Sequence, residues 1–112
     1  MLAPEARGGK PVAIVAISVT PIGTGSPSVG EYVADALRVI ERSGLRYRLN
    51  AMHTEIEGEL EQVLDLVPAI HRACFARGAK RVSTVIKIDD RRDAPSSMEA
   101  KVRSVEERLQ RP

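Results

Sequence analysis

Hydrophobic positions change their spacing several times along the chain, and each spacing predicts one element. Val12 to Val19 is a continuous, β-branched apolar run, which predicts a strand buried on both faces and ending at Thr20-Pro21. A Pro/Gly/Ser loop follows over 21–28. Apolar residues at helical spacing then predict a first helix, with a capping box at Ser28 to Glu31 and a stop at Ser43-Gly44.

The second half of the chain predicts a hairpin, two helices and a strand. Residues 45–52 alternate apolar and polar positions, and residues 53–59 can return beside them as a second strand. A helical stripe then runs from 60 to Arg77-Gly78, and Pro68 is expected to kink or open that helix. Residues 81–88 predict the last strand. Ser96-Ser97 begin a terminal helix, whose apolar stripe is Met98, Val102, Val105 and Leu109.

The predicted order is β-α-β-β-α-β-α, which places the chain in the α+β class. Its first six elements have the order of a ferredoxin-like β-α-β-β-α-β sandwich, to which the terminal helix is an addition. Two helices cover one face of such a sheet, yet the strand 12–19 is apolar on both faces. We therefore expect another subunit to cover the second face. Residues 1–10 are interpreted as a flexible leader and residues 11–112 as a single domain.

Composition narrows the classes of function. The 17 basic and 15 acidic residues are interspersed and leave a net charge of +2, so no broad basic surface for nucleic acid is expected. The strands 12–19 and 81–88 hold no aromatic residue on which bases could stack. No apolar run is long enough to span a membrane and no signal peptide is evident. Cys74 stands alone, which indicates a reducing compartment, and a cytoplasmic location is expected.

Candidate catalytic and metal-binding groups are few. Gly23 and Gly25 lie in a loop without the lysine of a phosphate-binding loop, and His53 and His71 lack the spacing of metal ligands. Cys74 falls on an apolar stripe, where a thiol is usually buried and unreactive. The sequence thus predicts neither a catalytic residue nor a metal site. The charged residues 89–93 are interpreted first as a solvated turn with mutual ion pairs and second as a contact between subunits.

Several short motifs occur in a fixed order from about Val12 to Leu109 and together are specific. They are Pro21-x-Gly-Thr-Gly, Ser28-Val-x-x-Tyr32, Ser43-Gly-Leu45, Tyr47, Met52-x-Thr54-x-x-Glu57-Gly58 and Lys87-Ile-Asp-Asp-Arg91. The chain in this respect resembles the thiamine-binding protein family, the small YkoF-like proteins. The resemblance implies a ferredoxin-like protomer and sheet-to-sheet dimers that pair into a homotetramer. It also implies binding of thiamine or its hydroxymethylpyrimidine part, without known chemistry on the ligand and without a cofactor.

Candidate ligand-binding residues follow from this resemblance and from the polar edge of an aminopyrimidine. Glu57 could accept a hydrogen bond from the exocyclic amine, while Thr54 and Ser18 could bond the ring nitrogens. Tyr32 or Met52 could cover the ring plane. The full candidate set is Ser18, Thr20, Gly23, Thr24, Tyr32, Met52, Thr54 and Glu57.

Two other classes of function stay open. The first is a structural or regulatory oligomer that contacts a protein partner. The second, ranked below it, is an enzyme that uses the carboxylates of Glu55, Glu57 and Glu59, because crowded carboxylates can have a raised pKa suited to acid-base catalysis.

Overall fold

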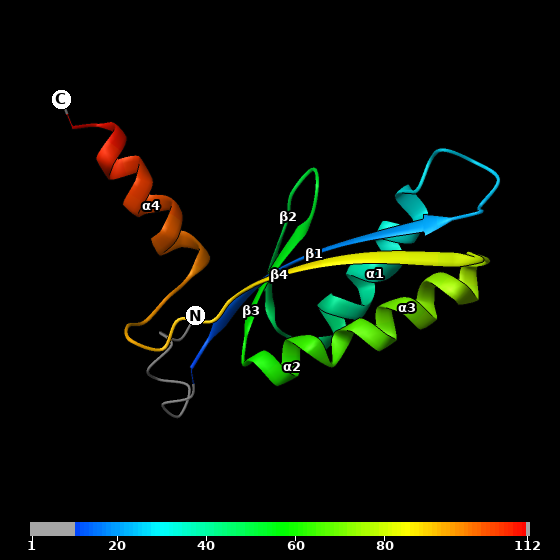
Figure 1. Ribbon diagram of the computed structural model, residues 1–112, viewed down its shortest axis with the longest axis horizontal. Helices are drawn as coiled ribbons and strands as arrows, with labels where there is room; N and C mark the ends of the chain where they lie inside the picture. The colour runs from blue at the N-terminus through cyan, green and yellow to red at the C-terminus, as the bar shows by residue number, and fades with distance from the viewer. Residues whose placement is uncertain (1–10, 112) are drawn as a thin grey trace.

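Helices cover one face of a four-stranded antiparallel sheet, and a last helix lies apart from them (Figure 1). The structure is a computed structural model and describes residues 11–111, so the predicted leader over 1–10 lies outside the described residues. The elements in chain order are β1 (Ala13–Ile22), α1 (Gly30–Ser43), β2 (Arg46–Leu49), β3 (Thr54–Gly58), α2 (Leu60–Leu64), α3 (Leu66–Arg77), β4 (Arg81–Asp89) and α4 (Met98–Leu109).

The strand order in the sheet is β2-β3-β1-β4, and every neighbouring pair is antiparallel. The predicted mixed architecture and the predicted hairpin are therefore confirmed. Since side chains alternate between the two faces of a strand, β1 presents Ala13, Val15 and Ile17 to the helices and Ile14 and Ala16 to the other face. The core under the helices consists of Ala13, Val15, Ile17, Ala36, Ile40, Ile56, Val63 and Ile70.

The predicted end of the first strand at Thr20-Pro21 is wrong, because β1 continues to Ile22. The carbonyl of Ile22 accepts a hydrogen bond from the backbone N–H of Lys80, on the β4 side. Backbone groups alternate in direction along a strand, so the nitrogen of Pro21 points to the opposite side. On that side β3 pairs with β1 only up to Ile17, so no described strand lies beside Pro21 to accept a hydrogen bond. The missing N–H of the proline therefore breaks no described strand pairing.

The predicted capping box at the start of the first helix is also wrong. α1 begins at Gly30, and its N-cap residue, Val29, makes no side-chain capping bond. The backbone N–H of Ser28 donates instead to the Ser26 hydroxyl at 3.1 Å, so Ser28 belongs to the loop. The predicted stop is confirmed, since Gly44 adopts a φ of 77°, a left-handed conformation that favours glycine.

The predicted effect of Pro68 is confirmed, because the second helical stripe divides into α2 and α3 at Asp65. Pro68 has no N–H to donate to the carbonyl of Leu64, which removes one bond of a continuous helix. α3 packs beside α1 on the helical face of the sheet, and the imidazole of His71 contacts the Thr84 hydroxyl of β4 at 2.6 Å.

The segment between β4 and α4 carries its charges as predicted, in local ion pairs at the surface. Arg91 pairs with Asp93 and Arg92 with Asp90. α4 then begins after Ser97, whose hydroxyl caps the helix by accepting from the N–H of Ala100 at 3.0 Å. Of the helices in the described range 11–111, none has the length and apolar character required to cross a membrane.

Candidate functional site

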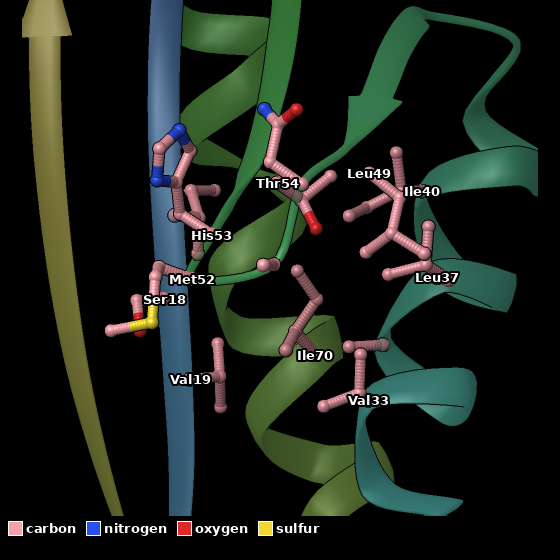
Figure 2. Close-up of a pocket in the computed structure, with 14 residues that line it drawn as sticks. Ser18, Val19, Val33, Leu37, Ile40, Leu49, Met52, His53, Thr54 and Ile70 are labelled. Carbon is pink, nitrogen blue, oxygen red and sulfur yellow. The ribbon is translucent and has the colours of Figure 1, made fainter. Parts of the chain in front are cut away.

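A pocket with an empty volume of about 490 Å³ lies where the β2–β3 hairpin ends against β1 and α1 (Figure 2). Its existence follows from the unequal strand lengths, because β3 accompanies β1 only as far as Ile17. Beyond that point the hairpin loop and the helices form the walls. The lining residues are Ile17, Ser18, Val19, Val33, Ala36, Leu37, Ile40, Leu49, Asn50, Ala51, Met52, His53, Thr54 and Ile70.

The hairpin loop shapes one side of the pocket. The backbone N–H of Asn50 donates to the carbonyl of His53 at 2.9 Å, which closes a tight turn. The Asn50 side chain donates to the Glu55 carboxylate at 2.9 Å and thereby fixes the loop to β3. Met52, at the tip of this turn, is 83% exposed and lies at the rim. Figure 2 shows Ser18 and Met52 on one side, opposite Val33 of α1.

The pocket combines apolar walls with two available hydroxyl groups. Thr54 is only 6% exposed, and neither its hydroxyl nor that of Ser18 has a hydrogen-bond partner among the described residues. Among the described residues no buried side-chain polar atom lacks a hydrogen-bond partner, so both hydroxyls are open to the pocket and free to bond a ligand. An apolar cleft with a few convergent polar groups is typical of sites for small, flat, polar-edged molecules.

A second hollow, a groove on the face of the sheet away from α1 and α3, joins this pocket. Its floor is Ile14, Ala16 and Ser18 of β1, and Ser18, Met52 and His53 line both the pocket and the groove. The groove also contains charge, from Glu55 and Asp89 and from Lys87 and Lys101. A ligand with a neutral ring and a cationic ring could thus place the neutral ring in the pocket and the cationic ring beside a carboxylate.

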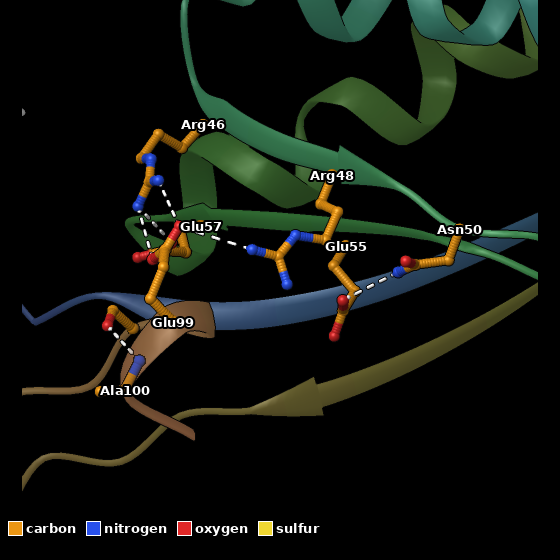
Figure 3. A network of polar contacts seen from close by, with 8 residues as sticks. Arg46, Arg48, Asn50, Glu55, Glu57, Glu99 and Ala100 are labelled. Atoms are coloured by element: carbon orange, nitrogen blue, oxygen red, sulfur yellow. Dashed lines mark hydrogen bonds and ion pairs between the residues drawn. The ribbon is translucent and has the colours of Figure 1, made fainter. Parts of the chain in front are cut away.

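Glu57 lies outside the lining of both hollows, although it is 1% exposed. Its carboxylate accepts from Nη1 of Arg46 at 3.2 Å, and Arg46 also forms a bidentate contact with Glu99 of α4 (Figure 3). The hydrogen bond from Arg46 lowers the pKa of Glu99 and raises that of Arg46. Glu57 therefore connects β3 to β2 and, through Arg46, to the start of α4. Its predicted ligand role stays a prediction.

Two other predicted residues, Thr24 and Tyr32, meet in a separate open hollow at the start of α1. Arg77 lines it too, but its guanidinium already contacts Asp35 and Glu31. The hydrogen bond from Arg77 lowers the pKa of Asp35. The cationic group of this hollow is therefore already engaged in a surface ion-pair network at the C-terminal end of α3.

The structure brings together Ser18, Met52 and Thr54 of the candidate set, whereas Thr20 and Gly23 line neither the pocket nor the groove. The sequence pattern did not single out Asn50 or His53 as site residues. Their position in the sequence could have indicated them, because Asn50 lies two residues before Met52 and His53 directly after it, in the turn of the predicted hairpin.

Cys74 and His71, two of the residues considered as catalytic or metal-binding groups, lie outside the pocket and the groove. Cys74 is fully buried, and burial raises the pKa of its thiol, which opposes nucleophilic use. His71 contacts Thr84, as described above. Within residues 11–111 no cluster of three or more His, Cys, Asp or Glu side chains could hold a metal ion.

Comparison with known proteins agrees with the resemblance noted in the sequence. Residues 15–106 match the model of a family described as thiamine-binding protein. The UPF0045 protein YqgV of Bacillus subtilis is 44% identical over 103 residues, covering 88% of this chain and 99% of that protein. A solved structure of protein MJ1052 from Methanocaldococcus jannaschii superposes with a TM-score of 0.78 at 31% identity, covering 86% of this chain and 97% of that one.

A third match carries a functional name. The protein TM0486 from Thermotoga maritima, named provisionally as a thiamine biosynthesis or salvage protein, superposes with a TM-score of 0.72 at 27% identity. The alignment covers 85% of this chain and 99% of that chain.

Proposed function

The chain belongs to the thiamine-binding protein family, and on that premise we propose that it binds thiamine or the hydroxymethylpyrimidine part of thiamine. The observation that carries the proposal is the pocket at the end of the hairpin, where the hydroxyls of Ser18 and Thr54 have no protein partner among the described residues. An aminopyrimidine has ring nitrogens that accept and an amine that donates, so both hydroxyls match its edge. The apolar side chains of α1 match its ring faces.

The charge of the groove extends the proposal to the second ring of thiamine. The thiazolium is cationic, and the pocket itself is lined by no Asp or Glu. Glu55 lies next to the junction at His53 and has no cationic partner among the described residues, because its contact is with the amide of Asn50. We therefore place the pyrimidine in the pocket and the thiazolium toward Glu55, where opposite charge favours it.

The fold and the assembly belong to the same proposal. The strand order β2-β3-β1-β4 supports a ferredoxin-like assignment. The open face of the sheet supports a homo-oligomer, proposed as a tetramer built from two dimers. We propose that the protein binds its ligand without converting it. Incubation of thiamine with the protein, followed by chromatography, tests this, and steady product formation would contradict it.

Calorimetric titration with thiamine and with the free hydroxymethylpyrimidine tests the site. Thr54→Val and Ser18→Ala should each weaken both ligands about 2- to 10-fold, the effect of one neutral hydrogen bond. Ser83→Ala, on the exposed strand β4 and outside both hollows, is the matched control and should bind as the wild type does.

Glu55→Gln separates the two rings. This variant should weaken thiamine but not the uncharged pyrimidine, since it removes a charge and preserves the shape. Equal affinities in the wild type, Thr54→Val and Ser18→Ala would remove the pocket from the proposal. An equal loss for both ligands in Glu55→Gln would contradict the placement of the thiazolium.

A further inference from the structure

Lys87 of β4 opens the motif Lys87-Ile-Asp-Asp-Arg91, to which the proposed ligand contacts assign no role. It pairs with Ala16 of β1, and Glu55 of β3 pairs with Ala16 from the other side. Because paired residues of antiparallel strands share a face, these three residues form one row across the groove. Neighbouring strands lie about 4.8 Å apart, so the backbones at Glu55 and Lys87 are roughly 10 Å apart.

The charges of the groove are only half neutralised by the chain itself. Of its two acidic and two lysine side chains, Lys101 and Asp89 form an ion pair at 2.5 Å. Glu55 accepts from the neutral amide of Asn50 (Figure 3). Neither Glu55 nor Lys87 has an ion-pair partner among the described residues. One carboxylate and one ammonium group are therefore open to a ligand, on opposite walls of the groove.

Unmodified thiamine would match only one of these two charges. In the proposed placement its thiazolium neutralises Glu55 and leaves the ammonium of Lys87 unmatched, in the same groove as a ligand cation. An anionic group on the thiazolium side would remove this imbalance. The thiazolium has a hydroxyethyl arm that can be esterified, and a phosphate monoester has a charge of about −1.5 to −2 near pH 7.

We propose that the preferred ligand is the phosphate monoester of thiamine, with its phosphate bound by Lys87. The inference rests on the proposed function, from which it takes the positions of the two rings. The ammonium of Lys87 donates a charge-assisted hydrogen bond to a phosphate oxygen. Lys101 lines the same groove and contributes less, because it is already paired with Asp89.

The next row of the open face limits the ligand to one phosphate group. Ile14 lies two residues before Ala16 on the same face of β1, roughly 7 Å along the strand. Its partner on β4 is Asp89. A second phosphate beyond Lys87 would meet this carboxylate, whose cationic partner is already engaged. Thiamine diphosphate should therefore bind no tighter than the monophosphate, and tighter binding of the diphosphate would overturn the monoester assignment.

Calorimetric titration of the full chain with thiamine, thiamine monophosphate and inorganic phosphate tests the inference. The wild type should bind the monophosphate about 3- to 30-fold tighter than thiamine, between the effect of an exposed ion pair and that of a charge-assisted hydrogen bond. Lys87→Gln should lower this ratio to one or below, and Lys87→Arg should preserve the preference. Lys80→Gln is the matched control, since Lys80 is exposed, lies outside both hollows and should keep the wild-type ratio.

The outcomes separate this inference from thiamine binding. A wild type that binds thiamine and its monophosphate equally well, or a ratio unchanged in Lys87→Gln, would overturn the inference and leave the proposed function standing. A wild type that binds neither compound would refute both. Inorganic phosphate should bind far more weakly than the ester, and equal binding of the two would overturn the assignment to an ester of thiamine. Added salt should reduce the preference, because it screens a partly exposed charge pair.

Discussion

At the scale of single residues, the most informative side chain is Glu57, a buried carboxylate held by one arginine. Its motif, Met52 to Gly58, is the most family-like stretch of the sequence, and this suggested a ligand contact. The structure pairs it with Arg46, which lies 11 positions earlier, and Arg46 with Glu99, 53 positions later. Such pairings depend on strand register and on the path of α4, so the sequence pattern alone could not predict them.

Arg46→Gln should lower the free energy of unfolding by about 1–3 kcal/mol, because Glu57 would stay buried without its cationic partner. Denaturant unfolding monitored by circular dichroism measures the change. Arg48→Gln is the control: Arg48 is more exposed and lies 3.7 Å from Glu99, so its loss should cost less than about 1 kcal/mol. Similar losses in both variants would show that the burial of Glu57 is not the cause.

At the scale of elements, the spacing of apolar residues predicted the strands and helices of residues 11–111, with α2 and α3 as one helix kinked at Pro68, and the errors fall at the ends of elements. β1 passes through Pro21 because the missing N–H faces a side on which no described strand pairs with it, and no local sequence pattern contains the order of strands in a sheet. The capping box failed because α1 begins at Gly30, which makes Val29 and not Ser28 the N-cap residue. Pro68 and Gly44 were predicted correctly, since each acts through the geometry of its own backbone.

Gly44 provides a prediction at this scale. Gly44→Ala should lower the free energy of unfolding by about 1–2 kcal/mol, because φ at this position is 77° and nothing else crowds the site. Gly30→Ala, in the first turn of the same helix and equally uncrowded, should be neutral or slightly stabilising. Denaturant unfolding of both variants provides the comparison. A loss in Gly30→Ala as large as in Gly44→Ala would contradict the argument from φ.

At the scale of the whole molecule, α1 and α3 cover one face of the sheet. The first turn of α4 contacts the other face at one end, through Glu99 and Lys101, and the rest of that face is not covered by any described helix. The sequence predicted this asymmetry, because β1 is apolar on both faces and the two helical stripes suffice for one. The pocket was only partly predictable. Ser18 and Thr54 were named from the family resemblance and the polar edge of an aminopyrimidine. The wall formed by α1 was not predicted, because it depends on β3 pairing with β1 only as far as Ile17.

If the chain forms the proposed homo-oligomer and the exposed apolar stripe of α4 (Val102, Val105 and Leu109) lies in its interface, the stability of the protein depends on its concentration. When an interface forms only between folded chains, mass action favours folding more strongly at higher concentration. The melting temperature of the wild type should therefore rise between micromolar and hundred-micromolar samples, while that of Val105→Asp should stay constant. Differential scanning calorimetry over that range measures both, and a constant wild-type value would contradict the linkage. A cell that lowers the abundance of this chain would then also shorten its lifetime.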